Sequence, residues 1–279
     1  MALRAIEHLF SKPAYNGKTL SLADVDVLIY CGVTRACLEP ATATLIQERL
    51  GLDCIVAFDV SNACLGFLDG FCLANALISS GQAESVLLVT AEIGTLYNRL
   101  AAEALARGDK PDSHFASLTL GDGAVAALVT ATDPTPGSLN FRYGIRRTLA
   151  RYSDLCIIRD KHSPMQTQPA KLFSAALLHF TPLIRDVVAA TGWSMKDIDL
   201  IVPHQASSRA ITLGALRVGY PLRKTAVTVK EFGNMASAAL PFALAHAIEK
   251  RGLEDLHRIA LLGFGSGLGI AVFTLEQAR

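Results

Sequence analysis

Hydrophobic positions in the first half of the chain form short continuous runs that alternate with segments of helical period. The runs of strand length cover residues 25–33, 54–60 and 85–90. Helical patterns cover the start of the chain, residues 40–50 with Pro40 in the first turn and Gly51 after the last, and the apolar stretch that begins at Cys64 and stops at Gly81. This alternation predicts a parallel sheet with helices on its faces.

The same rhythm returns in the second half after an irregular middle. We predict a helix over 98–112 and a strand over 118–129 that Gly121-Asp-Gly interrupts, whereas 133–167 has mixed charge with Pro and Gly breaks and no predictable element. Further helices are predicted over 169–191, from 207 and over 234–250, with strands over 199–204, 258–264 and 270–275. The pattern predicts an α/β chain of two similar halves, 1–133 and 169–279, around a variable, substrate-facing insertion over 134–168.

Composition narrows the function classes. The chain has 279 residues, of which 51% are hydrophobic and 18% charged, and 26 Lys+Arg balance 25 Asp+Glu. This balance offers no electrostatic footprint for nucleic acid or an anionic membrane. The helical start of the chain has neither the long apolar core nor the cleavage site of a signal peptide, so no export is expected. Asp69 and Asn75 interrupt the longest apolar stretch, which predicts a buried helix rather than a membrane span. Six cysteines without zinc spacing favour a reducing cytoplasm and no metal site.

Cys64 stands where an apolar run ends and a helical pattern begins, the place at which α/β sheets gather their sites. A thiol in the first turn of a helix would meet the positive end of the helix dipole, which predicts a pKa lowered toward neutrality. Its backbone N–H could also stabilise an oxyanion. A purely structural cysteine is the alternative that the spacing leaves open.

Two more polar residues occupy similar positions. His204 follows the apolar strand pattern before the helix from residue 207, and Asn234 precedes the helical pattern over 234–250. Taken singly, His204 would more often be a hydrogen-bonded core residue, and Asn234 a helix cap. The order Cys, His, Asn, followed by the glycine-rich segment 263–269, favours a catalytic set instead.

These segments resemble the β-ketoacyl-ACP synthase III branch of the thiolase superfamily over nearly the whole chain. The matching stretches are DVSNACLGF, LTLGDGAVAALV, IVPHQASSRA, EFGNMASAALPFAL and LLGFGSGLG. Elongating ketoacyl synthases use two histidines, and Asn234 stands in place of the second. Thiolases proper carry another cysteine in the C-terminal glycine-rich loop, where this chain has Ser266. The resemblance therefore implies a condensing enzyme with the layered α-β-α-β-α thiolase fold.

A closer resemblance is to the enzymes that condense two fatty acyl-CoAs head to head in bacterial olefin biosynthesis. The stretch GVTRACLEPATA carries it, and Glu39 matches the glutamate that reaches into the partner subunit's site as a base. The resemblance thus implies a homodimer. Read without the family, Glu39 before Pro40 is a favourable residue at a helix N-terminus, and this alternative stays open.

The resemblance also implies residue roles. Cys64 forms the acyl-enzyme, the backbone N–H groups of Cys64 and of the Ser266 turn hold the first oxyanion, and His204 and Asn234 stabilise the enolate of the second thioester. Arg209 is expected to meet a phosphate of the substrate arm. CoA or acyl carrier protein thioesters are substrates, and no cofactor is expected. Relatives usually begin with several tens of further residues, including the first strand of the core sheet, so these elements are expected to be missing.

Two other functions remain open. A decarboxylating β-ketoacyl-ACP synthase III would use malonyl-ACP as second substrate and needs no base. A non-catalytic partner subunit of a condensing heterodimer usually lacks the cysteine or the histidine, and this chain has both. A papain-like hydrolase also uses Cys, His and Asn, but not in repeated strand-to-helix settings.

Overall fold

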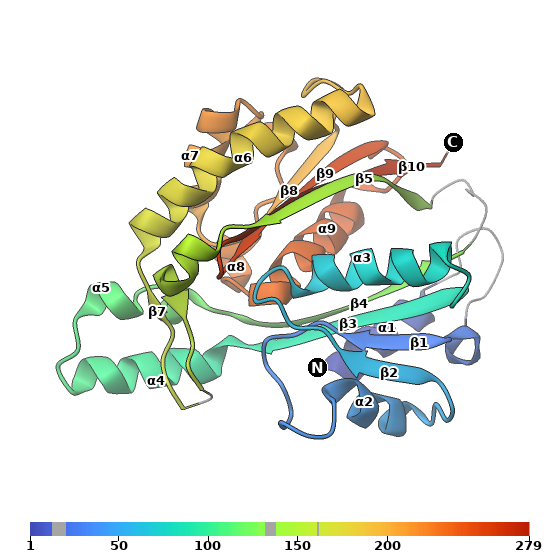
Figure 1. Cartoon of the computed structure of the whole chain (residues 1–279), viewed down its shortest axis with the longest axis horizontal. Helices are drawn as coiled ribbons and strands as arrows, with labels where there is room; N and C mark the ends of the chain where they lie inside the picture. Colours follow the sequence, from blue (N-terminus) through green and yellow to red (C-terminus); the bar gives the residue numbers. More distant parts are fainter. Residues whose placement is uncertain (13–20, 132–137, 161, 279) are drawn as a thin grey trace.

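Two four-stranded sheets and three layers of helices build the molecule. The computed structural model describes residues 1–12, 21–131, 138–160 and 162–278. Figure 1 shows the layers in the order helix, sheet, helix, sheet, helix, with α6 and α7 at the top and α2 at the bottom. α1 packs with α2 against the first sheet. The layered arrangement expected from the sequence is therefore confirmed.

The first sheet has the strand order β2-β1-β3-β4. Its strands are β1 (Val27–Tyr30), β2 (Val56–Asp59), β3 (Ser85–Ile93) and β4 (Asp122–Thr130). β1 pairs in parallel with β2 and β3, whereas β4 runs antiparallel to β3. The sheet is thus mixed rather than wholly parallel, because β4 returns alongside β3 after the excursion through α4 and α5.

The second sheet has the order β5-β10-β9-β8. Its strands are β5 (Leu139–Thr148), β8 (Leu200–Pro203), β9 (Arg258–Gly265) and β10 (Gly269–Gln277). Only β8 and β9 are parallel. β5 comes from the segment for which the sequence predicted no element, and it pairs with β10 near the chain's end. The same segment contributes the short ladder of β6 (Cys156–Ile157) and β7 (Gln166–Thr167), while residues 133–137 and 161 of it lie outside the described residues.

Helices cover both sheets and fill the space between them. The long helices are α1 (Ala2–Ser11), α2 (Thr42–Leu50), α3 (Gly66–Ser79), α4 (Gly94–Ala106), α6 (Pro169–Thr191), α7 (Ser208–Val218) and α9 (Ala239–Arg251). The short helices are α5 (Pro111–His114), α8 (Val229–Phe232), η2 (Leu22–Asp24), η3 (Ser117–Thr119), η4 (Ala150–Leu155), η5 (Leu222–Lys224) and η6 (Ala236–Ala238). α3 and α9 form the central layer (Figure 1).

The helix that follows Cys64 is α3, and its packing between the two sheets fixes its position. On one side Leu68 packs with Phe273 of the second sheet, and on the other Phe67 packs with Ile29 and Leu88 of the first. A helix that is apolar on all sides is stable only between two such layers. Its buried character was expected from the sequence.

α2 begins later than the sequence predicted, at Thr42 rather than at Pro40. The reason is a cap supplied from a neighbouring strand. The two carboxylate oxygens of Asp59 accept hydrogen bonds from the backbone N–H groups of Thr42 and Ala43, both at 2.9 Å. Such a carboxylate satisfies free N–H groups of the first turn and complements the helix dipole. Gly51 ends the helix in the left-handed conformation, as predicted.

α6 has the bounds that the sequence predicted, residues 169–191. By length and composition alone it could cross a membrane, and it is the one helix among the described residues that could. In the fold, its Phe180 and Leu183 pack with Ile270 and Val272 of the second sheet. An amphipathic covering helix of a layered protein has this arrangement.

Candidate active site

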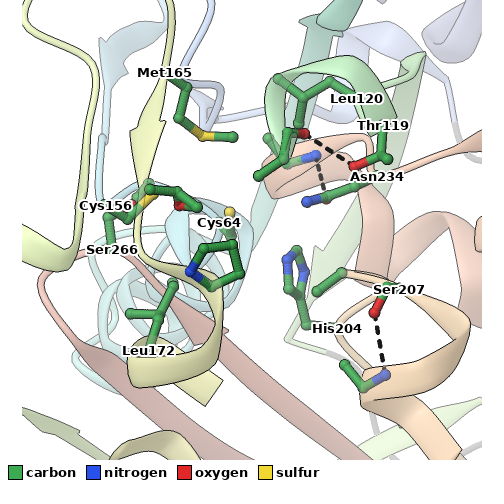
Figure 2. A pocket seen from close by; sticks show the side chains of 18 of the residues that line it. Cys64, Thr119, Leu120, Cys156, Met165, Leu172, His204, Ser207, Asn234 and Ser266 are labelled. Atoms are coloured by element: carbon green, nitrogen blue, oxygen red, sulfur yellow. Dashed lines mark hydrogen bonds between the residues drawn. The ribbon is translucent and has the colours of Figure 1, made fainter. Parts of the chain in front are cut away.

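One apolar cavity of about 600 Å³ gathers most of the predicted site. Its walls include five of the six residues that the sequence singled out: Cys64, His204, Arg209, Asn234 and Ser266. They come from the loop before α3, the end of β8, the first turn of α7, the loop before η6 and the turn between β9 and β10. Figure 2 shows Cys64 and Ser266 on one side of the cavity and His204 and Asn234 on the other.

Cys64 lies just before α3 rather than in its first turn, because Leu65 is the N-cap residue. The side chain is half-buried on the cavity wall. Burial raises the pKa of the Cys64 thiol well above its ordinary value, and nearby Cys156 and Glu92 raise it further. The predicted lowering of this pKa by the helix dipole is therefore wrong, since desolvation of the thiolate in an apolar cavity is the larger effect.

The glycine-rich turn lies directly against the Cys64 backbone. A Cβ atom at Gly265 would come within 3.1 Å of the Cys64 backbone N and 3.3 Å of its Cβ. Only a main chain without a side chain approaches comfortably so closely. This contact brings the Ser266 turn to the same corner as the Cys64 N–H, the corner where the oxyanion is predicted.

His204 leaves β8 with its position fixed by the backbone. Its N–H donates to the Leu262 oxygen at 2.8 Å, and its ring meets Phe264 edge to face, with centroids 5.1 Å apart. Burial lowers the pKa of His204 to about 4, so the imidazole is neutral near pH 7. Among the described residues, its Nδ1 has no hydrogen-bond partner. A core histidine held only for structure would ordinarily be bonded at that atom, so this alternative is disfavoured.

Gln205, the residue after His204, anchors the loop in the interior. Its Oε1 accepts from the backbone N–H groups of Thr228 at 2.8 Å and Val229 at 3.2 Å. Its Nε2 donates to the Pro203 oxygen at 2.7 Å and the Ala226 oxygen at 3.1 Å. The satisfied amide holds the end of β8, and with it the His204 ring, in one place.

Asn234 is held by a close crossing of two loops. Its N–H donates to the Thr119 oxygen at 2.9 Å, and its backbone oxygen accepts from Gly121 N–H at 3.0 Å. A Cβ at Gly121 would fall 1.9 Å from the Phe232 oxygen, so glycine is required there. The Asn234 side-chain oxygen accepts from the Ala236 N–H at 3.0 Å. This bond stabilises the turn at Asn234, but the helix cap of the alternative is wrong, because the N-cap residues of η6 and α9 are Met235 and Ala238. The side-chain amide nitrogen of Asn234 remains as the donor toward a ligand.

Glu39 is the predicted site residue that does not line this cavity. It lies exposed on the loop before α2, next to Leu38, which is 92% exposed. The alternative role of Glu39, at the N-terminus of α2, is wrong, because Asp59 accepts the hydrogen bonds of the first turn instead. Within one protomer, therefore, Glu39 is separate from the other site residues.

Two cavity residues were missed by the sequence analysis. Glu92 lies near the carboxyl end of β3 and lines the cavity, although it is only 3% exposed. A carboxylate at the end of an apolar run was the available signal. Cys156 of β6 places a second thiol on the cavity wall, beside Ser266 in Figure 2. No pattern pointed to it, since it belongs to the segment without predicted elements.

The layered fold defines a class of protein together with the site. A cysteine, a histidine and an asparagine around one cavity of this fold are typical of the thiolase-fold condensing enzymes. The comparisons agree: residues 58–145 match the family model of 3-oxoacyl-[acyl-carrier-protein] synthase III, and residues 188–276 match the model of its C-terminal part. The β-ketoacyl-[acyl-carrier-protein] synthase III of Oceanobacillus iheyensis is 31% identical over 93% of this chain and 78% of its own length. The chain therefore belongs to the β-ketoacyl-[acyl-carrier-protein] synthase III family, within the thiolase superfamily.

Relatives of a second kind are similar as well. The acyl-CoA:acyl-CoA alkyltransferase of Xanthomonas campestris is 29% identical over 91% of this chain and 76% of its own length. A structure of Xanthomonas campestris OleA with bound lauric acid and lauroyl-CoA superimposes with a TM-score of 0.83 at 27% identity, covering 91% of this chain and 76% of that one. A 3-oxoacyl-(acyl carrier protein) synthase III of Xanthomonas oryzae gives 0.88 at 27% identity, covering 99% and 81%. The protein is an acyltransferase of the Claisen-condensing kind.

Proposed function

We propose that this protein joins two acyl-CoA molecules to a β-keto product through an acyl group carried on Cys64. The observation that carries the proposal is that Cys64 faces His204 and Asn234 within one apolar cavity. A volume of about 600 Å³ leaves room for long aliphatic chains. The alkyltransferase name of one relative and the lauroyl-CoA bound to another support acyl-CoA as the substrate.

In the first half-reaction the Cys64 sulfur attacks the thioester carbonyl of one acyl-CoA. The new bond is the Cys64 thioester, the broken bond is that to the CoA sulfur, and CoA leaves as a thiol with the proton that Cys64 loses. Neutral His204 is placed to carry that proton across the cavity. The N–H groups of Cys64 and of the Ser266 turn stabilise the oxyanion.

In the second half-reaction, Glu39 of the partner subunit removes an α-proton from the second acyl-CoA. His204 and Asn234 donate hydrogen bonds to the enolate oxygen, and the α-carbon then attacks the Cys64 thioester. The Cys64 sulfur leaves and takes up a proton, and the product is a β-keto acyl-CoA. A water-excluding, apolar cavity strengthens these hydrogen bonds in the transition state. No cofactor enters either step.

A homodimer explains how an exposed Glu39 could reach a cavity. β2 pairs with β1 on one edge and with no other strand among the described residues, and its Val56 is 58% exposed. An open apolar edge favours pairing with a second chain. We propose that two copies meet there, with their central sheets continuous. The free thiols of all six cysteines favour the cytoplasm as the location.

Malonyl-ACP as second substrate is the other candidate, and the names of the synthase III relatives favour it. Decarboxylation of malonyl-ACP would supply the enolate without Glu39. Arg209, exposed at the cavity wall, would meet a phosphate of either CoA or the carrier protein's arm. A non-catalytic partner subunit is disfavoured because the three reactive side chains all line the cavity.

The distinguishing experiment follows β-keto product by mass spectrometry from a long-chain acyl-CoA alone and from acyl-CoA with malonyl-ACP. Product from acyl-CoA alone, lost in Glu39→Gln, supports condensation of two acyl-CoAs. The matched control is Glu48→Gln on the exposed side of α2. Product only with malonyl-ACP, unchanged by Glu39→Gln, contradicts the proposal in favour of the decarboxylating enzyme.

A further inference from the structure

We infer that Glu92 is a positioning residue that fixes the root of the loop over residues 32–40 and the Asn234 turn in one arrangement around the cavity. The inference rests on the proposed function, because the loop ends at Glu39 and the turn carries Asn234. Glu92 is 3% exposed, and its carboxylate receives hydrogen bonds from both segments. No sequence pattern or comparison assigned it a role.

The first set of contacts holds the loop. Glu92 Oε1 accepts from the Val33 N–H at 2.9 Å, and Oε2 accepts from the Thr34 N–H at 3.0 Å and the Thr34 hydroxyl at 2.9 Å. The Tyr30 hydroxyl contacts the oxygens of Thr34 and, at 2.7 Å, Ala91. The loop therefore starts from a clamped point and ends, five residues later, at exposed Glu39.

The second set of contacts holds the turn. Ser237 donates to Glu92 Oε1 from its backbone N–H at 3.3 Å and from its hydroxyl at 2.5 Å. The Ser237 hydroxyl also lies 2.5 Å from that of Thr90 on β3. Ser237 is wholly buried three residues after Asn234. One carboxylate thus joins β3, the loop and the turn.

The geometry requires a carboxylate. Its two oxygens accept from five donors, and a glutamine would turn an amino group toward N–H groups at one oxygen position. An aspartate keeps both acceptors but is shorter by one methylene. Releasing one partner of a buried, charge-assisted network leaves the donors unsatisfied and the segments free to shift.

The consequence falls on one half-reaction. Val33 and Thr34 line the cavity, Glu39 is the proposed base, and Asn234 is a proposed donor to the enolate. Attack of Cys64 on the first acyl-CoA uses none of these groups. Glu92 therefore acts mainly on the condensation. Its charge also helps to raise the pKa of the Cys64 thiol, so Glu92→Gln should not slow acylation. A misplacement of about 1 Å is sufficient for a rate loss of about 100-fold.

The test compares Glu92→Gln, Glu92→Asp and the control Glu84→Gln, an exposed carboxylate just before the same strand. Acylation of Cys64 is measured by rapid quench with intact-protein mass spectrometry, and condensation by β-keto product. We expect E92Q to acylate within about threefold of wild type and to condense at least about 30-fold more slowly. E92D should recover part of the loss, and E84Q should match wild type.

A second readout does not depend on the substrate. Hydrogen exchange at the amides of Val33, Thr34 and Ser237 should rise together in E92Q and stay unchanged in E84Q. If exchange rises in E92Q but the wild type makes no β-keto product, the proposed function is contradicted, whereas the positioning role of Glu92 stands. Normal condensation or unchanged exchange in E92Q would overturn the inference, as would equal losses in both half-reactions.

Discussion

Burial controls the protonation of the two titratable side chains that face each other in the cavity. It raises the pKa of the Cys64 thiol and lowers that of His204 to about 4. Both groups are therefore neutral near pH 7, rather than a thiolate and imidazolium pair. In the proposed reaction, the thiolate therefore forms only as Cys64 attacks the substrate.

Alkylation of Cys64 tests this resting state. Because only the thiolate reacts, the rate with iodoacetamide should keep rising between pH 7 and pH 10 without a plateau. Cys64→Ala identifies the signal, and Cys156→Ala removes the neighbouring thiol. A plateau that begins near pH 7 would show a thiolate stabilised by the helix N-terminus, contrary to the structure.

His204 should also make stability depend on pH. Its folded pKa of about 4 is below the ordinary 6.5, so its stabilising contribution is complete above pH 6.5. It is lost as pH falls through 6.5 toward 4, up to about 3 kcal/mol. Urea unfolding of wild type and His204→Gln between pH 7 and 4 should therefore differ in pH slope. His257→Gln, an exposed control, should keep the wild-type slope. Equal slopes in all three proteins would contradict the assignment.

The sequence predicted which residues belong to the site, but not the surroundings of their side chains. Sequence order and strand-to-helix placement predicted Cys64, His204 and Asn234 as one site, and all three line the same cavity. Their catalytic roles stay a prediction. The raised pKa of Cys64 and the five contacts of Glu92 depend on chain segments far apart in sequence. Periodicity carries no information on such contacts.

At the level of loops and elements, the crossing of Gly121 with Phe232 controls Asn234. Gly121→Ala would place a Cβ against a backbone oxygen, so the loops must separate. We expect a stability loss of about 2 kcal/mol, measured by urea unfolding, and a much slower condensation. Gly81→Ala is the control: it has positive φ but open space, so it should cost about 1 kcal/mol and leave activity intact. Equal effects of both substitutions would show that the crossing is unimportant.

Elements with strong local patterns were predicted well. The bounds of α6 agree with the prediction, and β8, β9 and β10 lie within a residue or two of theirs. β5 was missed because its pairing with β10 joins residues more than a hundred positions apart. The antiparallel return of β4 beside β3 was likewise set by tertiary packing. The division into 1–133, 134–168 and 169–279 stays a prediction.

At the level of the whole molecule, the exposed Glu39 predicts shared active sites. In a mixed dimer of Glu39→Ala and Cys64→Ala chains, one site combines native Cys64 with Glu39 of the partner subunit. Mixing the two inactive variants under subunit exchange should restore about a quarter of wild-type condensation, by random pairing. Wild type mixed with a Glu39→Ala, Cys64→Ala double variant calibrates the exchange, because the mixed dimers have no complete site and condensation should fall from about a half to about a quarter of the wild-type value. Complete inactivity of the mixture would mean that Glu39 acts within its own chain or not at all.

The most direct test of a Cys64 acyl-enzyme is the intact mass of the protein after brief incubation with a long-chain acyl-CoA. The wild type and Cys156→Ala should each gain the mass of one acyl group, with peptide mapping to Cys64, and Cys64→Ala should gain none. Added second substrate should then remove the group as β-keto product. An unchanged wild-type mass, or an acyl group on Cys156 instead, would contradict the account.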